Sequence, residues 1–440
     1  MFFPRGGSAQ VVRYLARNLP PYGWEPTILV GSARDDADAQ EFYEGLDVRP
    51  VDYTAALESP DPLMADPPLH PSYEDRPGEP DRIFAGVDDA TYEHMVAAWE
   101  RLLRDAGAAD ADVLHLSHLT PVNEAAERAF PDIPRVGHLH GTELLMLRDI
   151  EQDPDRWPHG PAWAERMKRW ARNCERLLVL STDAVKRVPD LLGVDPEKVV
   201  WAPNGFDPDL FDRRPIEGDE RRALWRRWLF DEPRGWDPET RKPGSVAYTE
   251  EDLAPFGEGP MLIYVGRYTE VKRIPLLIRA YARARRRFEL RAPLVLIGGY
   301  PGEWEGEHPL DVIRETDAQD VFLAGWRSHD ELGKALNASD VVVLPSVHEQ
   351  FGQVIVEGMA CGLPAIAVDA HGPATIIDDP GDGWLVPPDD EDAMADALVQ
   401  AVNDPQERRR RGDNAYDVAR ARYSWPALAE DVAAVYDQIV

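Results

Sequence analysis

Short apolar segments alternate with amphipathic segments along most of the chain, and this alternation limits the folds that the chain can adopt. The apolar segments are hydrophobic at nearly every position, so we expect each to be a strand covered by helices on both faces. Strands of this kind, alternating with helices, are typical of parallel sheets in α/β proteins. The expected strands cover residues 26–31, 112–117, 135–140, 176–181 and 198–203 in the first half, and 261–266, 293–298, 320–325, 340–345 and 364–369 in the second half.

The length of the chain indicates how these strands are divided. With 440 residues, the chain is long for a single hydrophobic core. We therefore predict an α/β protein with two doubly wound, Rossmann-like domains, at residues 1–211 and 259–424. The segment between them, residues 212–258, is rich in proline, glycine and charged residues and is expected to be a linker or insertion.

Two irregular segments have more than one interpretation. The stretch RRALWRRWLF, residues 221–230, has the pattern of a helix, and its tryptophans either pack against a domain, which we favour, or make a peripheral membrane contact. Residues 58–82 contain seven prolines. A segment of that length without expected secondary structure is either a functional loop or partly disordered.

Composition excludes several classes of partner. The chain has 48 basic and 80 acidic residues, a net charge of -32. Such a field repels a phosphate backbone, so we expect no nucleic-acid partner, and any phosphate site must be built locally from cations and helix amides.

The two cysteines give neither a disulfide framework nor a zinc spacing. Without a signal peptide or a membrane-length apolar run, we expect a soluble, cytoplasmic protein.

The motif YVGRYTEVKR, residues 264–273, places two cations directly after a predicted strand. Arg267 and Lys272 follow the strand end at Gly266. Because ligands of parallel α/β sheets bind beyond the carboxyl ends of the strands, these cations predict a clamp for an anion such as a diphosphate. The alternative is an ordinary basic loop.

The motif SVHEQFGQVIVEGMACGLP, residues 346–364, predicts a loop that leads into a helix near Phe351. Gly352 permits close approach of a ligand, and the free amides of residues 351–353 suit a phosphate. Gln353 and Glu357 are four residues apart and share a helix face. We expect Glu357 to accept hydrogen bonds from a ribose diol, and Glu349 to do the same for a second sugar.

Two other interpretations of Glu349 and Glu357 stay open. The pair resembles the acid/base carboxylates of a glycosidase, but nothing nearby predicts a raised pKa and the cations would then have no use. Alternatively, both glutamates are solvated surface residues.

The amino terminus departs from the pattern of a doubly wound domain. Gly6 and Gly7 form a glycine loop that feeds a helix, and such a loop is normally preceded by a strand. We expect either that Met1 is not the natural start, which we favour, or that the first strand is missing or replaced.

The chain resembles the retaining glycosyltransferases of family 4, which have two Rossmann-like domains facing a cleft, the GT-B fold. The resemblance extends over nearly the whole chain, and the order and spacing of its motifs make it specific. The motifs are PRGGSAQVV (4–12), HLHGTE (138–143), VLSTDAVK (179–186), APNGFDPDLF (202–211), VGRYTEVKR (265–273), PSVHEQFGQVIVEGMACGLPAIAVDAHGPATII (345–377) and GWLVPPDDEDAMADAL (383–398).

The resemblance implies a role for each candidate residue. Arg267 and Lys272 would hold the diphosphate of a nucleotide-sugar donor, and Glu357 would bind its ribose. Glu349 and the amides of Phe351, Gly352 and Gln353 would hold the transferred sugar, which His140 would face. Gly6 and Gly7 would approach the phosphates, and a final helix at 425–440 would cross back to the first domain. The catalytic set would be His140, Glu349, Arg267 and Lys272.

The implied reaction transfers a sugar to an acceptor hydroxyl with retention, without a metal or cofactor, and the leaving phosphate would take the acceptor proton. The DPD sequence at 207–209 is therefore interpreted as a turn with a helix cap rather than a metal motif. His115 and His118 are interpreted as structural. The loop DAHGPA, 369–374, differs from the usual Gly-Gly version in the family.

Two other functions remain as alternatives. One is a phosphorylase, with inorganic phosphate or a pyridoxal cofactor, or a hydrolase of the same architecture. The other is a non-catalytic nucleotide-sugar-binding protein.

Overall fold

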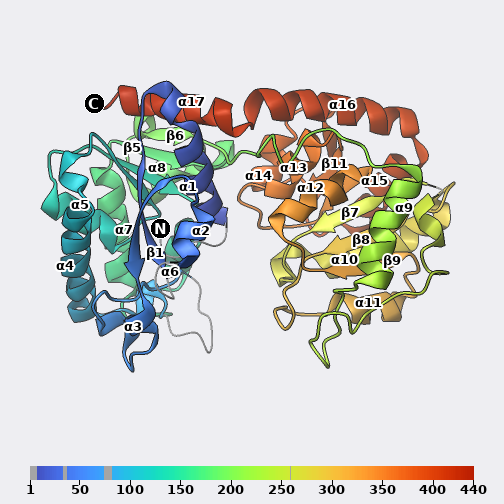
Figure 1. Ribbon diagram of the computed structural model, residues 1–440, viewed down its shortest axis with the longest axis horizontal. Coiled ribbons are helices and arrows are strands. Elements are labelled where there is room, and N and C mark those ends of the chain that lie inside the picture. Colours follow the sequence, from blue (N-terminus) through green and yellow to red (C-terminus); the bar gives the residue numbers. More distant parts are fainter. Residues whose placement is uncertain (1–6, 33–36, 74–81, 258) are drawn as a thin grey trace. The chain divides into compact units, whose positions relative to one another are not determined.

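Parallel strands form the centre of two separate units in the computed structural model, which describes residues 7–32, 37–73, 82–257 and 259–440 (Figure 1). The first unit contains Met1–Asn204 and Trp425–Val440, and the second contains Gly205–Ser424. Both units have the predicted Rossmann-like α/β architecture, and the predicted fold class is confirmed. Gly6 lies outside the described residues.

The described strands of the first unit form a two-stranded sheet, β2-β1, and a four-stranded sheet, β3-β4-β5-β6, with all pairs parallel. The edge strand β2 was missed by sequence because it carries charged residues and Pro50, which an edge strand tolerates. The strands are β1 (Thr27–Ser32), β2 (Asp47–Asp52), β3 (Leu114–Ser117), β4 (Arg135–Leu139), β5 (Arg176–Val179) and β6 (Val199–Trp201).

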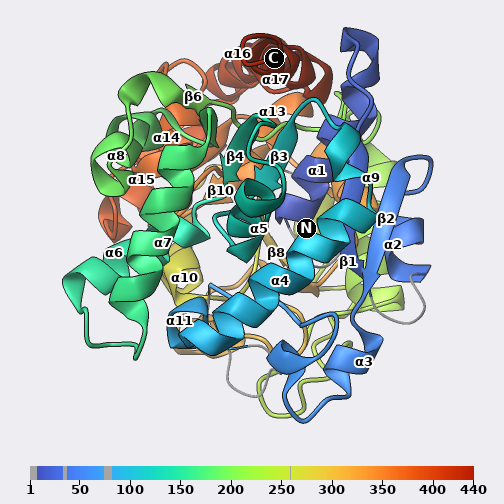
Figure 2. The same ribbon diagram turned by 90° about the vertical axis from the view of Figure 1, so that its left-hand side faces the viewer.

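Helices cover both faces of the strands in the first unit. The carboxyl-terminal helix α17 packs on α1, where Tyr14 stacks on Trp425 with ring centroids 5.5 Å apart. Helices α4 and α5 lie side by side (Figure 2), and the buried Trp163 and Trp170 of α7 belong to the main core. The helices are α1 (Gly7–Asn18), α2 (Ala37–Phe42), α3 (Thr54–Leu57), α4 (Asp89–Asp105), α5 (Pro121–Ala129), α6 (Thr142–Gln152), α7 (Gly160–Asn173), α8 (Thr182–Leu192) and α17 (Trp425–Asp437).

The second unit has a six-stranded parallel sheet in the order β12-β11-β10-β7-β8-β9. Read from β9, this is the doubly wound order 3-2-1-4-5-6, so the direction of winding reverses between β7 and β10. Nearly all strand residues are buried because helices cover both faces. The strands are β7 (Leu262–Val265), β8 (Leu294–Ile297), β9 (Val321–Gly325), β10 (Val341–Leu344), β11 (Ala365–Val368) and β12 (Gly383–Val386).

The helices of the second unit also form layers. Helix α10 contacts α11 and α15, while α13 contacts α12, α14 and α16. The helices are α9 (Gly218–Arg226), α10 (Ile274–Ala284), α11 (Pro309–Thr316), α12 (His329–Asn337), α13 (Gln353–Ala360), α14 (His371–Ile376), α15 (Glu391–Asn403) and α16 (Pro405–Arg422).

The predicted linker, residues 212–258, is part of the second unit. Helix α9 continues into a short π-helical turn, and the indoles of Trp225 and Trp228 are buried 5.6 Å apart in an edge-to-face pair. Trp236 is also buried, with its ring N–H donating to the carbonyl of Gly299. These aromatic residues attach the segment to the second unit, so the favoured interpretation of residues 221–230, in which the tryptophans pack against a domain, is confirmed.

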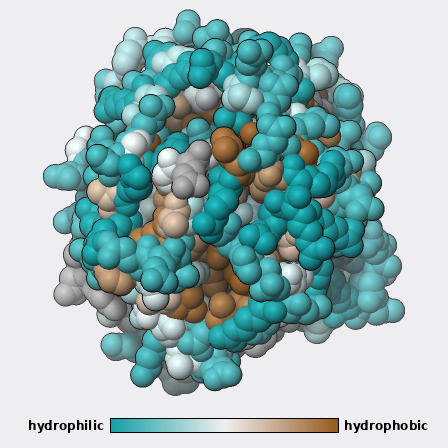
Figure 3. Space-filling model, turned by 90° about the vertical axis from the view of Figure 1, so that its right-hand side faces the viewer, coloured by the Kyte–Doolittle hydropathy of each residue, from teal (hydrophilic) through white to brown (hydrophobic). Residues whose placement is uncertain are grey.

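One face of the molecule is mostly polar (Figure 3). Figure 3 shows a mostly hydrophilic face, with hydrophobic residues visible only in recesses between polar ones. None of the helices in the described ranges combines the length and apolar character needed to span a bilayer.

We expect Trp225→Ala to lower the free energy of unfolding by about 3–5 kcal/mol, because it opens a large cavity in a packed core. The matched control is Phe230→Ala in the same segment, whose side chain is 39% exposed. That control should cost less than about 1 kcal/mol. Urea unfolding followed by fluorescence measures both, and equal small effects would contradict the assignment of this segment to the core.

Candidate active site

The strongest candidate site of the second unit lies where β7 and β10 are neighbours. Val341 of β10 pairs with Leu262 of β7, so the loops that follow the two strands leave the sheet side by side. The loops also bond to each other, because the N–H of Val347 and the hydroxyl of Ser346 both donate to the carbonyl of Val271, at 3.0 and 3.2 Å. Open α/β sheets bind ligands in the crevice at the switch point, where the strand order reverses, and here that point lies between β7 and β10.

Both predicted cations lie on the loop after β7. Arg267 is exposed, and its guanidinium has no ion-pair partner within the described ranges. The ammonium of Lys272 forms an ion pair with Glu349, which lies on the loop after β10. The structure therefore brings Lys272 and Glu349 together, and leaves Arg267 available to an anion.

The start of α13 supplies the expected backbone donors. The helix begins at Gln353, two residues later than predicted, and Gly352 caps it with a φ of 103°, a left-handed conformation that favours glycine. Within the described part of the chain, the N–H groups of Phe351, Gly352 and Gln353 donate to no protein acceptor. Three free donors at a helix amino terminus suit a phosphate or a sugar oxygen.

The loop that carries DAHGPA packs against this helix start. The N–H of Gly372 donates to the carbonyl of Glu349 at 3.0 Å, and a Cβ added at Gly372 would lie 2.2 Å from the carbonyl oxygen of Phe351. His371, which stands in place of the first glycine of the usual Gly-Gly pair, has a φ of 49°. A glycine is therefore required at 372, whereas 371 accepts a side chain in a left-handed conformation.

Glu357 is buried inside the second unit, with 2% of its surface exposed. Its Oε1 accepts hydrogen bonds from the imidazole of His329 at 2.8 Å and from the amide of Gln353 at 3.1 Å. Gln353 also donates to the carbonyl of Gly205 at 2.7 Å, which fixes its orientation. Among the described residues, Oε2 has no hydrogen-bond partner. A buried carboxylate with one oxygen unsatisfied is prepared to accept from a ligand hydroxyl.

Sequence analysis missed His329, the residue that orients this carboxylate. It occupies the first position of α12, and its ring packs edge-to-face on Phe211 at 5.0 Å. Burial alone would lower its pKa, but the hydrogen bond and the charge of Glu357 raise the pKa above the ordinary value. No local motif marks this residue, because its partner is 28 positions away in the sequence.

Two exposed aromatic residues at the same edge of the sheet were also missed. Tyr300 follows β8 and Trp326 follows β9, and they are 56% and 47% exposed, with ring centroids 6.1 Å apart. Trp326 lies three residues before His329. The sequence did contain a signal, because glycine followed by an aromatic residue occurs after both strands.

In the first unit, His140 lies directly after β4, at the carboxyl end of the sheet, because the strand ends one residue earlier than predicted. It belongs to a histidine cluster, which we define as His115, His118, His138 and His140. His138 stacks on His140 with centroids 4.5 Å apart, and His115 bonds to His138 at 3.1 Å. His115 also bonds to the hydroxyl of Tyr436, which supports its interpretation as structural.

Three members of the histidine cluster, His115, His138 and His140, are held neutral by their surroundings. Burial lowers the pKa of His115 to about 4. Burial, together with repulsion from neighbouring histidines, lowers the pKa of His138 and of His140 well below the ordinary value. Within the described ranges, Nε2 of His140 is buried without a hydrogen-bond partner. His140 is therefore available as a neutral hydrogen-bonding group rather than as a cation.

Glu143 on α6 connects this cluster to the helix start. Its Oε1 accepts from the N–H of His140 at 3.0 Å and its Oε2 lies 3.3 Å from Nδ1 of His118. Burial opposes ionisation of Glu143, but His118 and these hydrogen bonds lower the pKa of its carboxyl group.

Gly7, the first residue of α1, is exposed, and space for a side chain surrounds it.

The DPD segment forms a turn. The carboxylate of Asp207 accepts from the N–H of Asp209 at 2.9 Å, and its carbonyl accepts from Phe211. In the residues that the structure describes, no three or more His, Cys, Asp or Glu side chains are placed to hold a metal ion.

The lowered pKa values of His115, His138 and His140 predict acid-sensitive stability. An unfolded histidine has a pKa of about 6.5, so below that pH the unfolded state binds protons that the folded state does not. The free energy of unfolding should fall as the pH drops from about 6.5 to about 4, by up to about 1.4 kcal/mol per pH unit for each such histidine. Urea unfolding at several pH values measures the slope.

The variant His115→Gln should flatten this pH dependence, because it removes one of the groups that titrates. The control His159→Gln changes a histidine outside the cluster and should keep the original slope. An unchanged slope in His115→Gln would refute the link between this cluster and acid sensitivity.

Comparison with solved structures defines the class. Sucrose-phosphate synthase from Thermosynechococcus elongatus superimposes with a TM-score of 0.65 at 20% identity, over 100% of this chain and 94% of that one. HepE of Anabaena, in complex with UDP-glucose, superimposes with a TM-score of 0.65 at 19% identity, over 99% and 96%. The chain therefore has the GT-B fold of these glycosyltransferases.

Sequence comparison defines the family. Residues 5–210 match the family model described as Glycosyltransferase Family 4, and residues 249–418 match Glycosyl transferases group 1. D-inositol 3-phosphate glycosyltransferase of Kineococcus radiotolerans is 33% identical over 327 residues, 70% of this chain and 67% of the relative. The chain belongs to glycosyltransferase family 4, and the resemblance noted in its motifs is confirmed.

The relatives differ in their named activities. The MMP alpha-(1->4)-mannosyltransferase of Mycolicibacterium hassiacum is 25% identical over 99% of this chain and 95% of its own length. The family assignment thus establishes glycosyl transfer and leaves the sugar and the acceptor to be determined.

Proposed function

We propose that the protein transfers a sugar from a nucleoside diphosphate to an acceptor hydroxyl, with retention of anomeric configuration and without a metal or cofactor. The observation that supports the proposal is that the neighbouring loops after β7 and β10 carry free anion donors and lead into a helix that holds a carboxylate with an unused oxygen. Arg267 and the α13 amides provide the donors, and Glu357 provides the carboxylate.

The donor-binding roles follow from the chemistry of each group. A diphosphate needs cations and N–H donors, which Arg267, Lys272 and the start of α13 supply. A ribose diol needs a hydrogen-bond acceptor, which Oε2 of Glu357 supplies, while His329 and Gln353 hold the other oxygen. The solved HepE structure with UDP-glucose, whose fold this chain shares, is in keeping with a nucleotide-sugar donor.

The exposed Tyr300 and Trp326 add a surface suited to the base. Trp326 precedes the ribose-side residue His329 by three positions, and a purine or pyrimidine can stack on an exposed indole. The proposal specifies no base, sugar or acceptor. The first experiment, which identifies the base, is therefore a thermal-shift screen with uridine, guanosine and adenosine diphosphates.

Catalysis in this proposal is mainly electrostatic. Negative charge develops on the leaving diphosphate, and Lys272, Arg267 and the α13 amides would stabilise it. The leaving phosphate takes the acceptor proton, so no side chain has to act as nucleophile. The neutral imidazole of His140 would orient a hydroxyl of the transferred sugar.

Product analysis tests the reaction itself. The protein is incubated with the nucleotide-sugars of each diphosphate that binds, and nucleotide release is followed with and without acceptor. Release that requires an acceptor, and an anomeric proton coupling unchanged from the donor, are the expected results. Release without acceptor favours a hydrolase, and binding without release favours a non-catalytic nucleotide-sugar-binding protein.

Residue variants separate the ribose role from the leaving-group role. Glu357→Gln should weaken nucleoside diphosphate binding by about 10-fold or more, because a charge-assisted hydrogen bond contributes about 1.5–3 kcal/mol. Lys272→Ala should mainly lower kcat, by about 10²- to 10³-fold, because it removes charge stabilisation in the transition state. Calorimetry and steady-state kinetics measure these effects.

The controls for this pair are Glu251→Ala and Lys242→Ala, which change exposed residues outside the candidate site. Both should leave affinity and kcat unchanged. Unaltered nucleotide affinity in Glu357→Gln would contradict the ribose assignment.

A further inference from the structure

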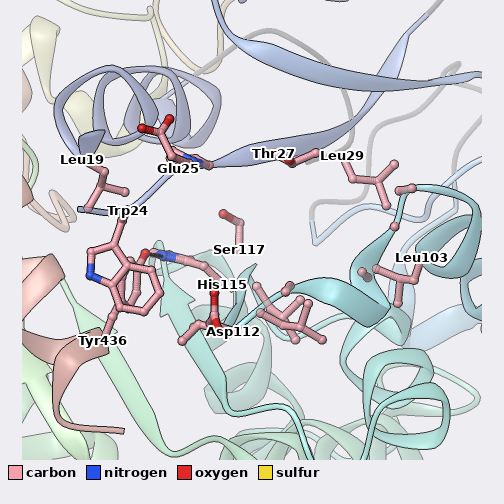
Figure 4. Close-up of a pocket in the computed structure, with 18 of the residues that line it drawn as sticks. Leu19, Trp24, Glu25, Thr27, Leu29, Leu103, Asp112, His115, Ser117 and Tyr436 are labelled. Atoms are coloured by element: carbon pink, nitrogen blue, oxygen red, sulfur yellow. Dashed lines mark hydrogen bonds between the residues drawn. The ribbon is translucent and has the colours of Figure 1, made fainter. Parts of the chain in front are cut away.

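Two cavities in the described part of the chain differ in their charge. The larger one, about 740 Å³ in the first unit, is lined by apolar and acidic residues such as Trp24, Glu25 and Asp112, and by no Lys or Arg (Figure 4). The smaller one, about 190 Å³, lies within the second unit, and we call it the arginine pocket. Its charged lining consists of Arg213, Arg221, Arg408, Arg409, Glu217 and Asp340. Such a surplus of cations, in a chain with a net charge of -32, requires either structural partners or an anionic ligand.

The arginine pocket lies at the amino ends of the strands of the second unit. Asp340 directly precedes β10 and Pro364 directly precedes β11, and these two strands are parallel neighbours. The loops of the candidate donor site follow the carboxyl ends of β7 and β10 instead. The two sites are therefore at opposite edges of the same sheet, and an anion in the arginine pocket would not occupy the donor site.

Two of the arginines have partners in the fold. Arg221 of α9 donates to the carboxylate of Asp340 at 2.8 Å. Arg408 of α16 donates through Nη1 to the carbonyls of Ala401 and Val402, at the end of α15, at 2.6 and 3.1 Å. Within the described ranges, the other nitrogens of the Arg408 guanidinium have no acceptor. Arg221 is thus a structural residue, whereas Arg408 keeps unused donors.

The other two arginines have more unused donors. Arg213 donates through Nη2 to Asp413 at 2.6 Å, and its Nε and Nη1 have no acceptor among the residues that the structure describes. Arg409 is exposed, and no described residue accepts a hydrogen bond from it or forms an ion pair with it. Burial lowers the pKa of Arg408, and although Asp340 opposes this shift, repulsion from Arg409 adds to it. Positive groups are therefore crowded together here.

The helices that end at the pocket do not need these arginines as caps. Helices α12 and α13 both end there. The last four carbonyls of α12, residues 334–337, accept from three N–H groups and from the hydroxyl of Ser339. Three carbonyls near the end of α13, residues 357–359, accept from the N–H groups of residues 361–363. The unused guanidinium donors are therefore left for a ligand.

The segment that carries Arg213 is attached to the wall of the pocket. The carbonyl of Asp212 accepts from the side-chain amide of Asn337 at 3.0 Å, and the N–H of Arg214 donates to the same amide group at 2.7 Å. Asn337 is the last residue of α12 and lines the pocket. The position of this segment therefore depends on the pocket side of α12.

The same segment also contacts the candidate donor site. The carbonyl of Gly205 accepts from the amide of Gln353 at 2.7 Å, and Phe211 packs edge-to-face on His329 at 5.0 Å. Gln353 and His329 are the two groups that hold Oε1 of Glu357. An anion that ties this segment to α16 would therefore help to fix the groups that orient Glu357.

We propose that the arginine pocket binds a small anion that carries a phosphate group, and that this anion raises the affinity of the donor site for a nucleoside diphosphate. Guanidinium groups suit phosphate oxygens because they present several N–H donors in one plane. Arg213, Arg408 and Arg409 supply these donors, and the cavity has room for a phosphate group with a short organic part. Binding in the pocket is independent of the proposed function, whereas the effect on nucleotide affinity rests on it.

Chemical footprinting of the full chain tests the pocket directly. Phenylglyoxal modifies exposed arginines, mass spectrometry locates the modified residues, and the probes are inorganic phosphate and glycerol 3-phosphate. A probe at ten times its Kd should slow modification of Arg213 and Arg409 by about 10-fold, because only about a tenth of the pockets stay empty. Arg410, which pairs with Glu407 and is outside the pocket lining, should react at its original rate.

The two probes distinguish the sources of the phosphate group. Protection at lower concentrations of inorganic phosphate would indicate a site for the free anion, and protection at lower concentrations of glycerol 3-phosphate would indicate a site for a phosphate monoester. Either result supports the proposal. Equal slowing at Arg213, Arg409 and Arg410, or slowing at none of them, would overturn it.

Neighbouring substitutions separate the pocket from the general charge of α16. Arg409→Ala should weaken binding of the better probe by about 10-fold, because charge-assisted hydrogen bonds are lost. Arg410→Ala makes the same change in net charge on the same helix and should leave the affinity unchanged. Calorimetry measures both. An equal loss in the two variants would show that only net charge matters and would refute the site.

The effect on the donor site is measured with the nucleoside diphosphate that the thermal-shift screen identifies. A saturating probe should tighten nucleotide binding by about 5-fold or more in the unmodified protein and in Arg410→Ala, which is the usual size of coupling between two sites. In Arg409→Ala, the probe should give no such gain. An unchanged or weaker nucleotide affinity in the unmodified protein would overturn the effector role. Absence of nucleotide binding with and without the probe would refute the proposed function and the effector role together, while footprinting decides separately whether the pocket binds an anion.

Discussion

The pairing of β10 with β7 is the interaction on which the candidate donor site depends. These strands are not consecutive in the sequence, but their register brings the loop with Arg267 and Lys272 against the loop with Glu349. The hydrogen bonds to Val271 then hold the two loops together. The sheet therefore holds together groups that are about eighty residues apart in the sequence. Electrostatic stabilisation of a reacting group requires charged groups that are held in place in this way.

The net charge of -32 makes this local arrangement necessary. A strongly acidic molecule repels a diphosphate at long range, and salt screens that repulsion beyond about 8–10 Å. Within that distance, the charged and polar groups near the site determine whether an anion binds. In the proposed function, Arg267, Lys272 and the amides of residues 351–353 supply the local positive groups that bind an anion in spite of the overall charge.

The sequence predicted the fold, and it predicted that Arg267 and Lys272 follow a strand end, because these signals are local. Buried parallel strands are continuous apolar runs, and the two cations directly follow one of them. It failed where the cause is tertiary. The proline, glycine and charge content of residues 212–258 does not show which domain the segment joins, although the favoured packing of its tryptophans against a domain is confirmed. His329 is defined only by its distant partner Glu357. The edge strand β2 was missed because it has little apolar character.

The ion pair of Lys272 with Glu349 connects two parts of the proposed donor site. Their side chains are 21% and 18% exposed, so separation of the pair leaves both charges in a partly desolvated place. In the proposed assignment, Lys272 leaves its ion pair with Glu349 and pairs with the diphosphate instead. The hydroxyls of the sugar then donate hydrogen bonds to the carboxylate of Glu349. A nucleotide-sugar compensates both charges, whereas a nucleoside diphosphate compensates only Lys272 and leaves Glu349 without a partner. The same pair would thus favour the intact donor over the nucleotide product, which helps the product to leave.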